Sequence, residues 1–159
     1  MLENTKRANR ANIKIGVIGG DLRQLVAAQT IAEAGYETAV YGADSYDGEL
    51  GMAIRCVNLN DAVNKSNFIL LPLPYSLDDI HVNTPLSESE IHLSEIFSKL
   101  TSGQVVLAGK INTKEHQDIK NMFDDNDKTN IKIIDYYDRE DLTILNALPI
   151  ALSKLPIIK

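Results

Sequence analysis

Five short apolar runs recur along the chain, and polar or amphipathic stretches separate them. The runs are rich in β-branched residues and span residues 13–18, 36–41, 68–73, 105–108 and 131–135. Runs of this length and composition are typical of strands that are buried on both faces of a sheet. The stretches between them favour helical crossovers, so we expect parallel strands. The pattern therefore predicts an α/β, doubly wound, Rossmann-like or flavodoxin-like domain in three layers, with a five-stranded parallel sheet in the order 2-1-3-4-5.

Periodic apolar positions predict two clear helices. The first spans residues 21–34, and the second begins near residue 87, where Ser87 and Glu90 have the spacing of a capping box. The inward residues of the first helix are Leu25, Ala28 and Ala32, flanked by Leu22 and Ile31, and those of the second are Leu93, Ile96, Phe97 and Leu100.

Shorter or less regular elements are expected elsewhere in the chain. Residues 52–57 indicate a short extended piece, and residues 59–64 indicate a single helical turn. Residues 76–85 have no clear period and predict a mobile loop over the ligand-binding face. A further helix is expected around residues 112–123, and a final helix begins within residues 136–141.

Length and composition indicate one ordinary globular domain. The chain has 159 residues, of which 44% are hydrophobic and 24% charged, and its net charge of −6 at pH 7 disfavours nucleic-acid binding. No apolar run approaches the roughly 18 residues of a membrane-spanning helix, so we expect no membrane association. Residues 1–12 are polar and slightly basic, which predicts a flexible N-terminal tail rather than a signal peptide. Residues 13–159 then form the single domain.

Cysteine and histidine usage limits the chemistry. Cys56 is the only cysteine, which excludes an internal disulfide and favours a reducing, cytoplasmic location. Its apolar neighbours favour a buried, inert thiol. The three histidines, His81, His92 and His116, lack ligand spacing, so we predict no metal site.

The turn after the first apolar run is the strongest candidate for binding chemistry. Residues 19–23 read Gly-Gly-Asp-Leu-Arg between the first predicted strand and the first predicted helix. Free backbone N–H groups at a helix start attract anions, and the planar guanidinium of Arg23 suits a carboxylate. Gly19, Gly20, Asp21 and Arg23 are therefore candidate ligand-binding residues. The alternative is a tight turn in which Asp21 caps the helix and Arg23 is a surface side chain.

The same turn does not fit a dinucleotide site. That motif requires Gly-x-Gly-x-x-Gly, whereas Asp21 stands two residues after Gly19 and no glycine follows at Leu22 or Gln24. The carboxylate of Asp21 would also repel a pyrophosphate held nearby. We therefore predict no cofactor-binding residues in this chain.

Two further segments follow predicted strands and reach the same edge of a parallel sheet. Lys110 and Asn112 follow the fourth apolar run, and Arg139 and Glu140 follow the fifth. Lys110 can neutralise an anion there. For both segments the alternative is a solvated loop that caps or precedes a helix. Together with the first turn, these residues predict a site for a small dicarboxylate, with no side chain assigned to catalysis.

Four segments, taken in order, resemble the A subunit of dipicolinate synthase. They read Gly-Gly-Asp-x-Arg-Gln at 19–24, Leu-Leu-Pro at 70–72, Gly-x-Ile-Asn at 109–112 and, at 139–149, Arg-Glu-Asp followed by Asn-x-x-Pro. The resemblance runs from about residue 13 to residue 149. It implies a Rossmann-like N-terminal domain that precedes, in that family, a separate NADP-binding domain.

The resemblance also implies an activity. Members of the family are oxidoreductases that make dipicolinate, the calcium-binding acid of bacterial spores. Their substrate is a cyclic dicarboxylate of the lysine and diaminopimelate branch of biosynthesis. A second protein, the B subunit of dipicolinate synthase, completes the activity. This chain then corresponds to the substrate-side domain, the NADP-binding domain is absent, and we expect no hydride transfer by these residues alone.

Two departures keep a second interpretation open. In the family, Thr, a small residue, Glu and Gly follow the Asn-x-x-Pro, whereas Pro149 is followed here by Ile-Ala-Leu-Ser at 150–153. The chain also stops at Lys159, before any cofactor domain. The alternative is a non-catalytic small-anion-binding or assembly module that kept the fold. The apolar residues 157–158 favour a partner surface, and we expect a homo-oligomer.

Overall fold

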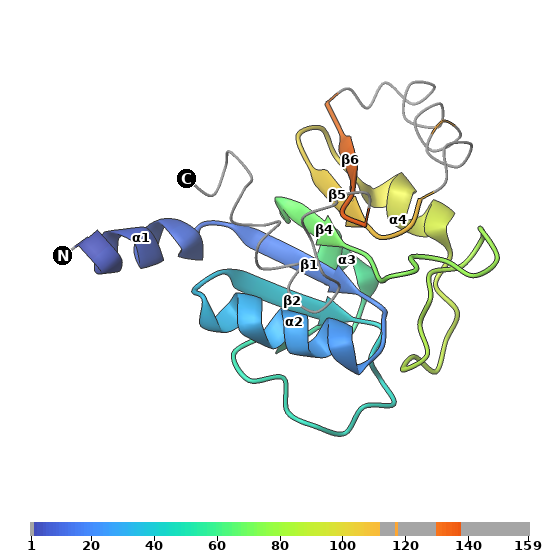
Figure 1. The fold of residues 1–159 in the computed structure, drawn as a ribbon, viewed down its shortest axis with the longest axis horizontal. Helices are drawn as coiled ribbons and strands as arrows, with labels where there is room; N and C mark the ends of the chain where they lie inside the picture. Colours follow the sequence, from blue (N-terminus) through green and yellow to red (C-terminus); the bar gives the residue numbers. More distant parts are fainter. Residues whose placement is uncertain (1, 112–116, 118–129, 138–159) are drawn as a thin grey trace.

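A computed structural model describes residues 2–111, 117 and 130–137. These residues form a parallel six-stranded sheet in the order β3-β2-β1-β4-β5-β6, with helices on both faces (Figure 1). The strands are β1 (Lys14–Ile18), β2 (Glu37–Tyr41), β3 (Ile54–Arg55), β4 (Phe68–Leu70), β5 (Val105–Ala108) and β6 (Lys132–Asp135). The helices are α1 (Leu2–Ala11), α2 (Leu22–Glu33), α3 (Leu59–Val63) and α4 (Leu93–Lys99).

The predicted sheet is confirmed, with one addition. The five apolar runs form β2-β1-β4-β5-β6, which is the predicted order 2-1-3-4-5, and every pair is parallel. The prediction of five strands was wrong because residues 54–55, within the expected extended piece, add an edge strand. That strand pairs through only two positions, Ala39 with Ile54 and Val40 with Arg55. Its apolar signal is too short to distinguish it from a loop.

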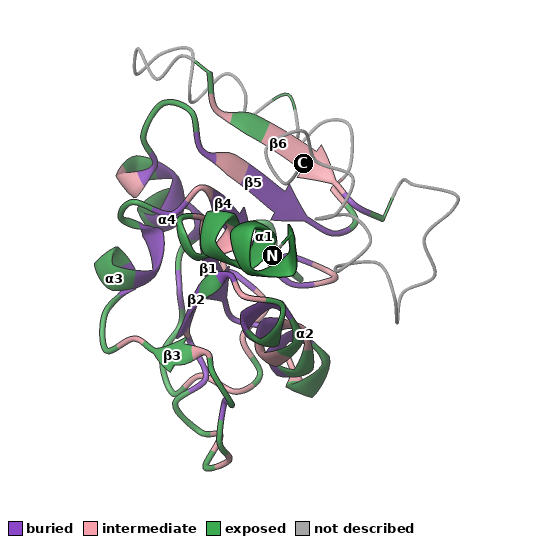
Figure 2. Ribbon diagram, turned by 90° about the vertical axis from the view of Figure 1, so that its left-hand side faces the viewer, coloured by how far each residue is buried: buried purple, intermediate pink, exposed green. Residues whose placement is uncertain are grey.

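Alternating side chains of the central strands supply two hydrophobic cores. On one face, Ile15, Val17, Phe68 and Leu70 pack with the inward side of α2. On the other face, Ile18, Ile69 and Leu71 pack with α3 and α4. Figure 2 shows the central strands mostly buried, the edge strand β3 exposed and β6 mostly of intermediate burial, with exposed residues on the outer surfaces of the helices. The sheet is therefore a rigid frame that fixes the loops at its edges.

Helix α2 forms as predicted, apart from the position of Leu22. Asp21 is its N-cap and accepts a 2.9 Å hydrogen bond from the N–H of Arg23. The buried arc of α2 contains Gln24, Leu25, Ala28, Ile31 and Ala32. Leu22 was expected at the edge of this arc but is 56% exposed. At 3.6 residues per turn, Leu22 lies about 120° from Ala28 at the centre of the arc.

Residues 2–11 of the predicted N-terminal tail form the helix α1, which the sequence pattern did not predict. None of its residues is buried, and the helix extends away from the sheet (Figure 1). Glu3 in the first turn and Arg10 in the last turn complement the helix dipole, which stabilises α1 although none of its residues is buried. Arg10 Nη1 also donates a 3.0 Å hydrogen bond to the carbonyl oxygen of Ala34.

Helix α4 is confirmed, but its predicted capping box is wrong. The helix begins at Leu93, and its N-cap residue, His92, makes no side-chain capping bond. Ser87 Oγ instead lies 3.2 Å from Asp44 Oδ2, and the N–H of Glu88 donates to the same oxygen at 3.1 Å. These contacts with the loop after β2 replace the local cap. The single turn expected at 59–64 is α3, whereas most of the helices expected around 112–123 and from 136–141 lie outside the described residues.

Candidate functional site

The carboxyl ends of the central strands meet at one edge of the sheet because all of the strand pairs are parallel. The Gly19–Arg23 turn follows β1, and Lys110 follows β5. The fold therefore brings these two predicted segments to the same edge. The other predicted site residues, Asn112, Arg139 and Glu140, lie outside the described residues.

The Gly19–Gly20 turn has a left-handed backbone, with φ of +69° and +85°. The N–H of Gly19 donates to the carbonyl oxygen of Tyr41, and the N–H of Gly20 donates to that of Asn83, both at 2.9 Å. The expectation of free amides at these two glycines is therefore wrong. Both N–H groups hold the turn against neighbouring segments, which fixes the direction in which α2 begins.

Asp21 and Arg23 form a closed pair at the start of α2. Arg23 Nη2 donates to Asp21 Oδ2 at 2.8 Å, and Arg23 Nε lies within 3.2 Å of both carboxylate oxygens. This hydrogen bonding lowers the pKa of the Asp21 carboxyl and raises the pKa of the Arg23 guanidinium. The Arg23 side chain is 59% exposed, and its Nη1 has no partner among the described residues. The arginine is thus both oriented by Asp21 and accessible to a ligand.

The crevice between β1 and β4 is the switch point of the sheet, because the chain crosses to opposite faces after these two strands. Nucleotides bind at such crevices in doubly wound proteins. Here the buried Gln24 side chain spans it, with Nε2 donating to the carbonyl oxygen of Leu70 at 3.3 Å. A Cβ atom built on Gly19 would lie 2.6 Å from Thr84 Cγ2 and 3.0 Å from Val82 Cγ1. Side chains of α2 and of the loop after β4 therefore fill the crevice.

The ends of β5 and β6 are tied together by Asp135. Its carboxylate accepts hydrogen bonds from the N–H groups of Lys110, Ile111 and Tyr137 at 3.1, 2.6 and 2.8 Å. Lys110 has a left-handed backbone, with φ of +65°, and its amino group has no partner in the described part of the chain. Asp135 thus holds the segment that presents Lys110, a role that nothing in the sequence pattern indicated.

Tyr136 follows β6 and is buried. Burial and the charge of Asp135 raise the pKa of its phenol, and the charge of Arg23 acts in the opposite direction. Because β1 and β6 belong to one parallel sheet, the turn after β1 and the segment after β6 lie at the same edge of that sheet.

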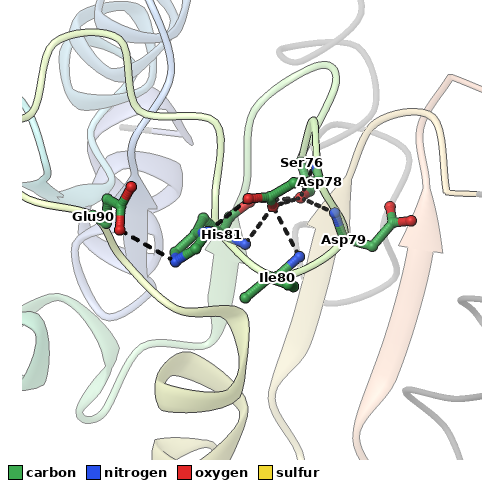
Figure 3. Close-up of polar contacts among 6 residues, drawn as sticks. All are labelled: Ser76, Asp78, Asp79, Ile80, His81 and Glu90. Carbon is green, nitrogen blue, oxygen red and sulfur yellow. Dashed lines mark hydrogen bonds and ion pairs between the residues drawn. The ribbon is translucent and has the colours of Figure 1, made fainter.

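A second polar cluster lies in the loop between β4 and α4 (Figure 3). Asp78 Oδ2 lies 2.6 Å from His81 Nδ1, and Glu90 Oε2 lies 3.4 Å from His81 Nε2. Sequence analysis missed this cluster, although the spacing of Asp78 and His81 was visible. The contact of Glu90 with His81 could be recognised only in the folded loop, because the two residues are not close in the sequence.

The residues that the structure describes give no evidence for a metal site or for a membrane-spanning helix. Within them, no three His, Cys, Asp or Glu side chains are grouped so that they could hold a metal ion. No helix among them is both long enough and apolar enough to cross a bilayer. Cys56 was predicted to be buried but is only partly buried; burial raises the pKa of its thiol, which favours an unreactive side chain.

The sheet order, the crossovers on both faces and the polar turns at the carboxyl edge define a Rossmann-like α/β domain. Residues 14–137 match the family described as the N-terminal domain of the A subunit of dipicolinate synthase. The chain belongs to that family, and the resemblance found in the sequence is confirmed.

Three proteins illustrate the relationship. The A subunit of dipicolinate synthase from Bacillus subtilis (strain 168) is 25% identical over 138 residues, which cover 86% of this chain and 44% of that protein. The crystal structure of the dipicolinate synthase A chain from Bacillus subtilis has a TM-score of 0.66 at 24% identity, covering 82% of this chain and 42% of that one. The crystal structure of the A subunit of dipicolinate synthase from Bacillus halodurans has a TM-score of 0.64 at 28% identity, with the same coverage of 82% and 42%.

More distant structures share the fold alone. The NAD-complexed D-isomer specific 2-hydroxyacid dehydrogenase from Lactobacillus delbrueckii ssp. bulgaricus has a TM-score of 0.54 at 12% identity, covering 93% of this chain and 44% of that one. The fold is therefore one that dehydrogenases use. This chain spans less than half the length of each of these proteins.

Proposed function

We propose that this chain is the substrate-side domain of a dipicolinate synthase-like oxidoreductase. It binds a small cyclic dicarboxylate of the lysine and diaminopimelate branch, from which dipicolinate is formed during sporulation in the cytoplasm. The family match over residues 14–137 carries this proposal. The accessible Arg23 at the carboxyl edge of the sheet supports the ligand class.

Arg23 and Lys110 provide the positive charge for a diacid. The Nη1 group of Arg23 has no partner in the described part of the chain, so one carboxylate can dock there while Asp21 holds the other side of the guanidinium. Lys110 can receive the second carboxylate because its amino group is unpaired among the described residues. Gly19 and Gly20 set the direction of the turn, and Asn112, Arg139 and Glu140 complete the proposed site.

The nicotinamide cofactor, NADP, is proposed to come from a separate domain. Two features of this chain support that division. The crevice at the switch point is filled by Gln24 and by residues 82–84, and the N–H of Gly20 is already bonded to Asn83. The Asp21 carboxylate, at the N-cap of α2, would also repel a pyrophosphate held nearby. The B subunit of dipicolinate synthase and further copies of this chain are the proposed partners.

A titration with pyridine-2,6-dicarboxylate tests the ligand site. We expect saturable binding by the wild type, followed by calorimetry or NMR, and at least about tenfold weaker binding by Arg23→Ala, which is about 1.4 kcal/mol. Lys132→Ala is the matched control, because it removes one positive charge at the opposite edge of the sheet, where β6 begins. Equal affinities of Arg23→Ala and the wild type would remove Arg23 from the site.

A titration with NADPH tests the division of labour. We expect no saturable binding to residues 1–159. Binding in the micromolar range would mean that this domain holds the cofactor, and the proposal would fail.

The alternative function is a non-catalytic small-anion-binding or assembly module. The residues after Pro149, which differ from the family pattern, favour it. The natural reading frame discriminates between the two. Continuation beyond Lys159 into a Gly-x-Gly-x-x-Gly segment supports the oxidoreductase, and a stop codon at that point supports the module.

A further inference from the structure

His81 lies between two carboxylates in the 76–93 loop, by which we mean the later part of the connection between β4 and α4 together with Leu93, the first residue of α4. Its Nδ1 is 2.6 Å from Asp78 Oδ2, and its Nε2 is 3.4 Å from Glu90 Oε2 (Figure 3). A neutral imidazole carries one N–H and can satisfy only one acceptor, whereas the imidazolium carries two. The geometry around His81 therefore favours the protonated ring.

The two carboxylates belong to opposite arms of the loop. Asp78 lies in the turn that precedes His81, and its Oδ1 accepts from the N–H groups of Ile80 and His81 at 2.9 and 2.7 Å. Glu90 lies in the returning arm. The arms are also joined by backbone hydrogen bonds from Val82 to Ile91 (2.8 Å) and from Leu93 to Ile80 (2.9 Å). The charge on His81 therefore acts across the point where the two arms meet.

The first arm continues directly onto the Gly19–Gly20 turn. The carbonyl oxygen of Asn83 accepts the N–H of Gly20 at 2.9 Å, and the side chains of Val82 and Thr84 occupy the space beside Gly19. Only one residue separates His81 from Asn83. A movement of the arm at His81 therefore also moves residues 82–84, which cover Gly19 and Gly20.

We propose that His81 is a proton-dependent latch of the 76–93 loop. In its charged form it pairs with Asp78 and Glu90 and keeps residues 82–84 seated on Gly19 and Gly20; when it loses the proton, the contact with Glu90 is lost and the loop opens more often. Because Gly19 and Gly20 belong to the proposed dicarboxylate site, the latch makes the access of a ligand to these two glycines depend on pH, whereas Arg23 is exposed even with the loop in place. That consequence rests on the proposed function, whereas the latch itself does not.

The titratable groups that face His81 are Asp78 on its own turn and Glu90 and His92 on the returning arm. The ring of His92 lies 4.4 Å from that of His81, between centroids, at an angle of 58°. The hydrogen bond with Asp78, and to a smaller extent the charges of Asp78 and Glu90, raise the pKa of His81 above its usual 6.5, although desolvation opposes them. In turn, the hydrogen bonds from His81 lower the pKa of Asp78.

The sign of the pH dependence follows from these two directions. A raised pKa of His81 means that the latch is fully present below pH 6.5 and is lost as the pH rises through the folded-state pKa. The lowered pKa of Asp78 means that the contribution of its carboxylate to the latch is present above pH 3.8. This contribution is lost as the pH falls through the folded-state pKa of Asp78. The loop is therefore held most firmly in mildly acidic solution and loosens toward alkaline pH.

Amide hydrogen exchange, measured by NMR on the 159-residue chain without ligand, tests the latch. The reporters are the N–H groups of Gly20, Val82 and Leu93, whose acceptors lie across the loop contacts. After correction for intrinsic rates, their opening constants should rise between pH 6 and pH 9 by about tenfold for each unit by which the measured pKa of His81 exceeds 6.5. The N–H of Gly19 is the internal control, since its acceptor is Tyr41 in β2, and it should not follow the loop.

Two variants separate the latch from a general effect of pH. His81→Gln should make the opening constants of Gly20, Val82 and Leu93 independent of pH. Glu90→Gln should lower the pKa of His81 and reduce the rise, whereas Glu88→Gln, two residues away in the same exposed arm, should behave as the wild type. An unchanged rise in His81→Gln, or a measured pKa of His81 at or below 6.5, would overturn the proposal. Neither result depends on whether the chain binds a dicarboxylate.

Discussion

The hydroxyl of Tyr136, directly after β6, donates a 3.1 Å hydrogen bond to the carbonyl oxygen of Leu71, directly after β4. These strands are not neighbours, because β5 lies between them. The phenol ring crosses the end of β5 at Gly109, where a Cβ atom would lie 2.9 Å from Tyr136 Cζ and 2.6 Å from Leu73 Cδ1. One side chain thus fixes the relative positions of three strand ends at the edge that carries the proposed site.

Removing the hydroxyl of Tyr136 should destabilise the domain. In Tyr136→Phe the buried carbonyl of Leu71 loses this donor, and we expect a loss of about 1–3 kcal/mol in the free energy of unfolding. Denaturant unfolding followed by circular dichroism measures it. Tyr137→Phe is the matched control, because that side chain is 49% exposed, and it should change the free energy by less than about 0.5 kcal/mol.

A methyl group at position 109 should also destabilise the domain, for a steric reason. Gly109→Ala places a Cβ atom against the Leu73 side chain and the Tyr136 ring, and overpacking of this kind costs about 1–3 kcal/mol. In a Leu73→Ala background the cost of Gly109→Ala should be smaller, because the 2.6 Å contact with Leu73 Cδ1 is removed, whereas the contacts with the Cβ atom of residue 73 and with Tyr136 Cζ, both at 2.9 Å, remain. Equal costs in both backgrounds would show that Leu73 Cδ1 does not oppose the new atom.

Asp21 should control the availability of Arg23. Asn is as good an N-cap as Asp, so Asp21→Asn should leave the stability nearly unchanged, while Asp21→Ala should cost about 1 kcal/mol. The substitution by Asn also removes the ion pair that occupies one side of the guanidinium. We therefore expect tighter binding of pyridine-2,6-dicarboxylate by Asp21→Asn, measured by calorimetry. Weaker binding would show that Asp21 acts on the ligand by a route other than competition for Arg23.

Arg55 should hold the loop after β2. Its guanidinium donates to the carbonyl oxygens of Ala43, Tyr46 and Gly48 at 2.5, 3.0 and 3.4 Å. Arg55→Ala should lower the free energy of unfolding by about 1–3 kcal/mol and expose residues 43–51 to limited proteolysis. Arg55→Lys keeps the positive charge but lacks the planar guanidinium that binds several carbonyl groups at once. In this variant residues 43–51 should therefore be cleaved at an intermediate rate. Cleavage of Arg55→Ala at the wild-type rate would contradict this role.

Periodicity along the chain was sufficient for the order of the long strands and for α2, because buried strands and an amphipathic helix leave strong local signals. The predictions that were wrong concern groups whose partners come from segments far away in the sequence. Ser87 had the spacing of a capping box, but Asp44, which is 43 residues away, binds it in the folded loop. Likewise, the amides of Gly19 and Gly20 were expected to be free, and the acceptors that occupy them lie in β2 and in the loop after β4.

The candidate site was predictable only in its outline. Parallel strands fix which segments share an edge, so the placement of the Gly19–Arg23 turn and Lys110 at the same edge of the sheet followed from the topology. The partners within the site did not follow, since Asp135 and Gln24 act through the backbone of distant segments. The pairing of Asp78 with His81 has a local spacing, but a lone histidine in a loop carries no signal of the carboxylate that folds back onto it.

The edge strand β3 has a consequence for how the protein behaves at high concentration. An exposed sheet edge is a template on which another chain can add a strand. Here the edge is only two residues long, and the guanidinium of Arg55 is turned back to bind carbonyl groups of its own loop. Ile54 and Val57 are left exposed beside it, yet a strand arriving there would gain only a few backbone hydrogen bonds. The short edge therefore protects the domain against growth into fibrils from this side of the sheet.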